Sequence, residues 1–244
     1  MNRSYDLSRF SLSDMTRCGA ELRALGAGTS CMEDSADRIV RYLYDVLRSV
    51  DGTTPACALV RLFVTMPYSG LEPGLQAFAR TLIGAAPSDP RTKCLTLLAT
   101  AGEEPGWNSR HTSNAHKALP LVSEATIARS PMIAQLITQL GVETGRLLAS
   151  DPNLVVDTAQ HTFNVFHVPV AAGSPYIPAQ SEFVASHDIR SVLGFGGLLP
   201  TGDLFAVILF SRVTIARESA DLFKTLSLNV KLALLPHAGG RMFA

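Results

Sequence analysis

Apolar residues spaced three and four positions apart predict two helices within residues 11–50, ahead of the first strand. Ser11 and Asp14 stand at the first and fourth positions of a capping box, in which each side chain can accept a backbone N–H of the helix terminus. Ser30 and Glu33 repeat this pattern before the second apolar run. The chain is therefore expected to begin with a pair of helices.

A third helical pattern, over residues 214–236, is the last predicted element, and Thr214 is its expected N-cap. Four of its apolar residues recur at close to heptad spacing: Leu222, Leu226, Val230 and Leu234. Such a stripe is typical of a helix that packs along a partner helix. We expect this helix, with the N-terminal helix, to form a parallel homodimer bundle.

Compact apolar runs predict the strands of a sheet. Residues 56–66 are apolar and β-prone with Arg61 as the only charge, which favours a buried central strand, and residues 93–102 are expected to pair with it antiparallel. A later hairpin is expected to place Gly202 in its turn at a positive φ. The extended segments that complete the sheet are predicted over residues 164–170, 182–185 and 191–211.

The region between these strands, residues 102–160, is predicted to be a long excursion from the sheet. Its first part is polar and rich in Gly and Pro, and Ser130 followed by Pro131 then opens a helix with the cap and the first-position proline where they are preferred. The order of helices, two strands, excursion, further strands and closing helix predicts an α+β domain whose antiparallel sheet lies within residues 55–212.

Bulk composition narrows the class of protein. The 244 residues are 47% hydrophobic and 17% charged, which fits one generous globular domain over residues 1–244. Lys plus Arg and Asp plus Glu balance at 21 each, so no global charge favours nucleic acid or an anionic membrane as a partner. The four cysteines lack zinc or disulfide spacing, and no secretory or membrane-spanning segment is evident, so we expect a cytoplasmic protein with reduced thiols.

The C-terminal third resembles the GAF family of small-molecule sensory domains. The resemblance is carried by SVLGFGGLLPTGDLFAVILFS and RESADLFKTLSLNVKLAL, and WNSRHTS and SPYIPAQSEFV bring it close to GAF-like segments at the N-terminal end of some bacterial histidine kinases and diguanylate cyclases. It implies a GAF-like antiparallel sheet with the N- and C-terminal helices on one face and the excursion on the other. It also implies a role in two-component signal transduction. No kinase or cyclase sequence follows residue 236, so we expect a stand-alone sensor or a module of a larger protein.

Candidate ligand-binding residues follow from the excursion and from the loop after residue 170. Trp107 and Arg110 could stack on and hydrogen-bond a planar or anionic ligand, and the alternative is that Trp107 pins the loop while Arg110 pairs with a local carboxylate. Tyr176 could present its hydroxyl at a pocket mouth, or could simply cover a strand edge. The predicted ligand-binding set is Trp107, Asn108, Arg110, His111, His167, Tyr176 and Phe195.

Other chemistry finds less support in the sequence. A non-covalent haem could take His111 or His167 as an axial ligand, but no matching ligand spacing supports a metal site, so no metal is expected and the cofactor stays unknown. No nucleophile stands in a catalytic motif, which predicts a protein that is not an enzyme. Two hypotheses follow: a sensory domain with a small ligand, or a ligand-free scaffold that docks a separate histidine kinase or cyclase.

Overall fold

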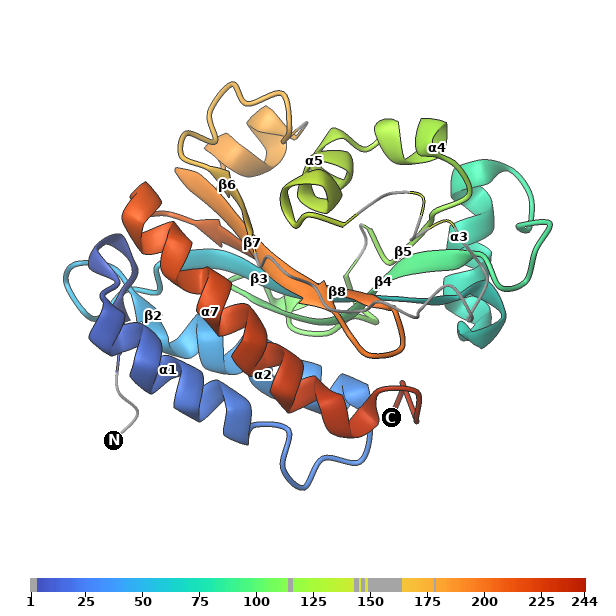
Figure 1. The fold of residues 1–244 in the computed structure, drawn as a ribbon. Helices are drawn as coiled ribbons and strands as arrows, with labels where there is room; N and C mark the ends of the chain where they lie inside the picture. The colour runs from blue at the N-terminus through green and yellow to red at the C-terminus, as the bar shows by residue number, and fades with distance from the viewer. Residues whose placement is uncertain (1–3, 114–115, 143–144, 146–147, 149–163, 178) are drawn as a thin grey trace.

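A six-stranded antiparallel sheet is the centre of the fold in the computed structural model, which describes residues 4–113, 116–142, 145, 148, 164–177 and 179–244 (Figure 1). Its strand order is β5-β4-β3-β8-β7-β6. The two long central strands are the predicted apolar runs, and they pair antiparallel as expected, with a bulge between Leu62 and Phe63. The strands are β3 (Cys57–Pro67), β4 (Lys93–Gly102), β5 (Ala118–Pro120), β6 (Val165–Val168), β7 (Ser191–Leu198) and β8 (Leu204–Ser211).

Three helices cover one face of this sheet: α1 (Leu12–Ala24), α2 (Met32–Val46) and α7 (Arg217–Leu234) (Figure 1). Their apolar stripes and the inward side chains of the strands form one buried core, in which Phe195 of β7 packs on Phe223 of α7. The predicted capping box of Ser11 and Asp14 starts α1. The N- and C-terminal helices therefore share one face, as the sequence predicted.

The opposite face carries the excursion, with α4 (Glu124–Ala128) and α5 (Pro131–Gln139) (Figure 1). A second core lies beneath it, where Leu136 and Ile137 of α5 pack with Ile208 of β8. Beside β5, at the edge of the sheet, lies α3 (Pro73–Ile83). The α+β fold class, with helices on one face of an antiparallel sheet and an excursion on the other, is confirmed.

Several local predictions were wrong. The segment predicted to be extended at residues 182–185 belongs to a π-helical turn, Gln180–Ala185. The last helix begins after Ala216 rather than Thr214. The second helix begins after Cys31, because Ser30 bonds to Asp34 instead of forming a box with Glu33.

Two short elements were not predicted. Strand β5 returns the excursion to the sheet edge, and a small parallel pair joins β1 (Tyr5–Asp6) to β2 (Leu47–Arg48) directly after α2. Two- and three-residue strands show no readable period, so their pairing depends on tertiary contacts. The hairpin turn was predicted correctly, since Gly202 has a φ of 77°.

The heptad-like stripe of the last helix has a different partner from the one expected. Leu226, Val230 and Leu234 are buried in the core of their own chain, against the sheet and α1. The prediction of a dimer assumed that this stripe has no partner within its own chain, and that assumption is wrong. A separate set, Leu228 and Leu232 on α7 and Leu235 directly after it, is 37–44% exposed.

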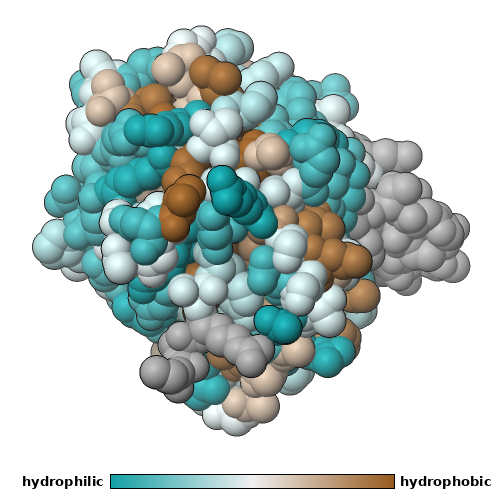
Figure 2. All heavy atoms as spheres, turned by 90° about the vertical axis from the view of Figure 1, so that its left-hand side faces the viewer, coloured by the Kyte–Doolittle hydropathy of each residue, from teal (hydrophilic) through white to brown (hydrophobic). Residues whose placement is uncertain are grey.

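None of the helices in the part of the chain that the structure describes is long and apolar enough to cross a bilayer. The face on the left of Figure 1 is seen front-on in Figure 2, where small hydrophobic patches are scattered among a hydrophilic majority.

Candidate functional site

A cavity of about 470 Å³ lies between the sheet and the excursion. Its floor is formed by alternate residues of the two central strands, since side chains two positions apart share a face of a sheet. Leu59, Arg61 and Phe63 come from β3, and Ile208 and Phe210 come from β8. A volume of this size is in the range of small-molecule sites.

The walls of the cavity are aromatic and aliphatic. Trp107 follows β4, while Phe183 lies in the π-helical turn and Met132 in the first turn of α5. Phe183 meets Phe210 edge-to-face with ring centroids 5.0 Å apart, and Trp107 meets Phe183 in the same way at 5.7 Å. The π-helical turn thus places a ring over the sheet that the predicted strand would not have placed there.

Charged groups stand at the mouth and on the floor of the cavity. His116, Arg129 and Glu182 are exposed lining residues, whereas Arg61 is only 7% exposed. The Arg61 Nη2 donates to Ser113 Oγ at 3.0 Å. Burial lowers the pKa of Arg61 to about 10, so the arginine keeps its charge at neutral pH.

The predicted ligand-binding residues are not brought together in this cavity, although Asn108 and Arg110 both line a separate one of about 480 Å³ beside α2. Trp107 is the one among the seven that lines this cavity. Phe195 is buried on the opposite, helical face, and His167 lies on β6, where its ring Nε2 is 3.0 Å from the Ile215 carbonyl. Tyr176 is half-buried and meets Phe166 edge-to-face, which matches the alternative of a covering residue.

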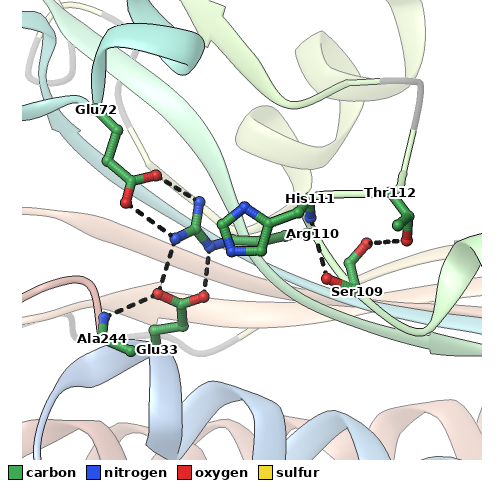
Figure 3. A network of polar contacts seen from close by, with 7 residues as sticks. All are labelled: Glu33, Glu72, Ser109, Arg110, His111, Thr112 and Ala244. Carbon is green, nitrogen blue, oxygen red and sulfur yellow. Dashed lines mark hydrogen bonds and ion pairs between the residues drawn. The ribbon is translucent and has the colours of Figure 1, made fainter.

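Arg110 holds a position between elements rather than in the cavity (Figure 3). Its guanidinium donates to both carboxylate oxygens of Glu33 on α2, at 2.5 and 3.0 Å. It also donates to both carboxylate oxygens of Glu72, the N-cap of α3, at 2.7 and 3.3 Å. The alternative weighed from the sequence, an arginine that satisfies local carboxylates, describes this geometry.

The two residues beside Arg110 in the predicted set also face away from the cavity lining. Asn108 closes the loop after β4, because its side-chain amide bonds to both the N–H and the carbonyl of Gly102, at 3.1 and 2.9 Å. His111 is exposed, and its backbone N–H donates to Ser109 Oγ (Figure 3). The two histidines considered for haem, His111 and His167, thus lie outside the lining.

The Arg110 contacts also hold the segment that follows the last helix. The Phe243 ring lies against the guanidinium, with the Arg110 Cζ 4.7 Å from the ring centroid. The first backbone N–H groups of α2, at Met32 and Glu33, donate to the carbonyls of Arg241 and Met242, at 3.1 and 2.9 Å. The returning chain therefore caps a helix that has no side-chain cap of its own.

Two further groups of side chains are of types that can be reactive: two buried cysteines, and a cluster of two glutamates with a histidine. Burial raises the pKa of both Cys57 and Cys94 to about 12, so neither is a thiolate at neutral pH. Glu103, Glu104 and His187 bring ligand-type atoms within 4.8 Å of one another. Glu103 forms an ion pair with Arg212, which balances its charge, and its other carboxylate oxygen lies 2.6 Å from His187 Nδ1.

Sequence reasoning missed most of the cavity lining. Arg61 carried a signal that could have found it, since it is a lone charge in an apolar strand and shares its face with Leu59 and Phe63. Phe183 carried none, because a six-residue π-helical turn has no pattern of its own.

Comparison with known proteins finds likeness in structure and none in sequence. Neither a family profile nor a curated protein matches the sequence. Structural matches at 11% identity include a GAF domain of a phosphoenolpyruvate-protein phosphotransferase (ptsP) from Coxiella burnetii, which has a TM-score of 0.49 and covers 93% of this chain and 95% of its own.

Two further matches at the same identity have lower TM-scores. A free methionine-R-sulfoxide reductase from Neisseria meningitidis, in complex with its substrate, has a TM-score of 0.45 over 96% of this chain and 98% of its own. The GAF domain of an Acinetobacter phosphoenolpyruvate-protein phosphotransferase has a TM-score of 0.44 over 95% and 99%. At such scores and identities the activities named for these proteins are theirs alone.

Proposed function

We propose that this chain is a GAF-like sensory domain of bacterial signal transduction whose small-molecule ligand binds in the cavity between the sheet and the excursion. The observation that carries the proposal is the cavity itself, about 470 Å³ in volume, with aromatic walls and a buried cation on its floor. Apolar surfaces with a few convergent polar groups are typical of small-molecule sites.

Contacts of one loop suggest how occupancy of the cavity would be transmitted. Trp107 lines the cavity, and three residues later Arg110 holds α2 and Phe243, which follows the last helix. A ligand that moves Trp107 would therefore strain the contacts that fix the chain beyond α7. We propose this route as the connection between ligand and output.

A retained ligand tests the sensory function directly. Native mass spectrometry of gently purified protein should show an added mass that is lost on denaturation. The variant Met132→Trp replaces a flexible side chain on the cavity wall with a bulky ring and should lose this mass. Leu82→Trp, at an exposed position of α3, should keep it. Protein that carries no added mass and takes up none from cell extract would count against the proposal.

We also propose a homodimer, now through the exposed side of α7. Leu228, Leu232 and Leu235 are spaced four and three apart, so they lie on one side of the helix. Leu232→Lys should convert a dimer into a monomer in sedimentation experiments at micromolar concentration, because it buries a charge at the interface. Leu82→Lys should have no such effect, and a wild-type protein that is monomeric throughout this range would contradict the dimer.

The compartment, the output partner and the lack of enzymatic activity also belong to the proposal. We propose a cytoplasmic domain that is not an enzyme and passes its signal to a histidine kinase or diguanylate cyclase, and the four free, buried cysteines fit a reducing compartment. The second candidate function is a ligand-free scaffold for the same partners. It is favoured by the Arg110 contacts, which fix the loop without any ligand.

A further inference from the structure

Arg61 is a buried cation in the middle of the central strand of the sheet. Strands β4 and β8 pair with β3 on either side, and they place Thr100 and Ile208 opposite Arg61. Arg61 has interaction partners within its own chain, and it also lines the cavity, where a bound anion would meet it.

Two hydroxyl groups accompany the guanidinium. Ser113 Oγ accepts a hydrogen bond from Arg61 Nη2. Thr100 lies directly across from Arg61, so both side chains are on the same face of the sheet. Thr100 is 1% exposed, and its Oγ1 has no hydrogen-bond partner within the described parts of the chain. Thr100 does not line the cavity, so Arg61 is the one of this pair that a bound ligand would meet.

The charges at the mouth reinforce the positive floor. Among the described lining residues, Arg61 and Arg129 carry two positive charges and Glu182 one negative charge. The described lining therefore favours a ligand with negative charge.

The walls add a preference for planar groups. Phe63, Trp107, Phe183 and Phe210 all line the cavity, and three of them contact one another edge-to-face. Aromatic surfaces gain most from another flat ring packed against them. A guanidinium in turn matches the geometry of a carboxylate, which it can bind through two parallel hydrogen bonds.

We propose that the cavity binds a small planar aromatic carboxylate, with its carboxylate on Arg61 and its ring against Trp107 and Phe183. This inference rests on the proposed sensory function and gives its ligand a chemical class.

Two probes of the same shape, one charged and one neutral, distinguish a site for aromatic carboxylates from a site for aromatic rings in general. Wild type and Arg61→Met are titrated by calorimetry with 2-naphthoate and with its neutral amide, 2-naphthamide. Loss of a hydrogen bond to a charged group should weaken naphthoate binding by about ten- to a hundredfold and leave naphthamide within about twofold. Arg61→Lys, which keeps the charge, should retain part of the naphthoate affinity, and Arg91→Met, an exposed arginine on a loop, should change neither.

Each outcome decides between the ligand class and the sensory function. If both probes bind wild type and Arg61→Met weakens neither or both equally, the cavity remains a ligand site and the carboxylate class is wrong. If neither probe binds but purified protein retains another small molecule, the class is again wrong and the sensor stands. If neither probe binds and no molecule is retained, both ideas fail. Should Arg61→Met not fold, Arg61→Gln compared with Arg61→Lys gives the same test.

Discussion

Replacing Arg110 with methionine is expected to lower the free energy of unfolding by about 3 kcal/mol. The side chain is 6% exposed and pairs with two carboxylates, of which Glu33 is 15% exposed. Removing one partner of a buried ion pair leaves the other charge uncompensated. The loss also removes the contact with Phe243. Urea denaturation followed by circular dichroism measures the change.

The expected loss has a matched control and a compensating variant. Arg91→Met breaks an exposed pair with Asp89 and should cost less than about 1 kcal/mol. Adding Glu33→Gln to Arg110→Met should recover part of the lost stability, because it removes the unpaired charge. Equal effects of the two arginine variants would show that Arg110 does not hold these elements together.

The effect of Arg110→Met on stability is expected to depend on pH through Glu72. The hydrogen bond from Arg110 lowers the pKa of this carboxyl below its ordinary value of 4.5. A lowered pKa in the folded state stabilises the protein above the ordinary value, and this contribution is lost as the pH falls through the folded pKa. The difference between wild type and Arg110→Met should therefore narrow in acid.

Gly26→Ala is expected to destabilise the protein by about 2–3 kcal/mol, through overpacking. Gly26 follows α1 where it meets the end of α7, and an added Cβ would lie 2.0 Å from the carbonyl oxygen of Ala233. Because the clash is with backbone, no side-chain rotation can relieve it, and the two helices must separate. Thermal unfolding of wild type and variant, followed by differential scanning calorimetry under the same conditions, measures the loss of stability.

Gly74→Ala is the control for this substitution. Gly74 lies in α3, and an added Cβ there would have no atom within 4 Å. Alanine favours a helix over glycine by about 1 kcal/mol, so this variant should be as stable as wild type or slightly more stable. If Gly26→Ala behaved in the same way, the close contact between α1 and α7 would be disproved.

The main architecture could be read from the sequence because its elements are long and strongly patterned. The run that became β3 is apolar apart from Arg61 and Thr65, and the stripe of α7 has a clear helical period. What could not be read was the partner of each pattern. The α7 stripe packs within its own chain, since a period shows which side of a helix is buried and not against what.

The candidate site was harder to predict because its residues come from distant segments. Trp107 was identified as an isolated aromatic residue in a loop, and it does line the cavity. Arg110 is only three residues away, yet it points to Glu33 and Glu72 instead. Adjacent residues of an irregular loop have no fixed angular relation, so neighbours in sequence can serve opposite faces of a sheet.

The most direct test of ligand binding in this cavity is an isoleucine methyl NMR spectrum recorded during titration with 2-naphthoate. Ile133, Ile177 and Ile208 line the cavity, whereas Ile39 and Ile215 are buried in the core on the helical face. The account predicts saturable shifts of the first three methyl signals, with the other two unchanged. Shifts confined to Ile39 and Ile215, or no shift at any of the five, would contradict the binding of an aromatic carboxylate in this cavity.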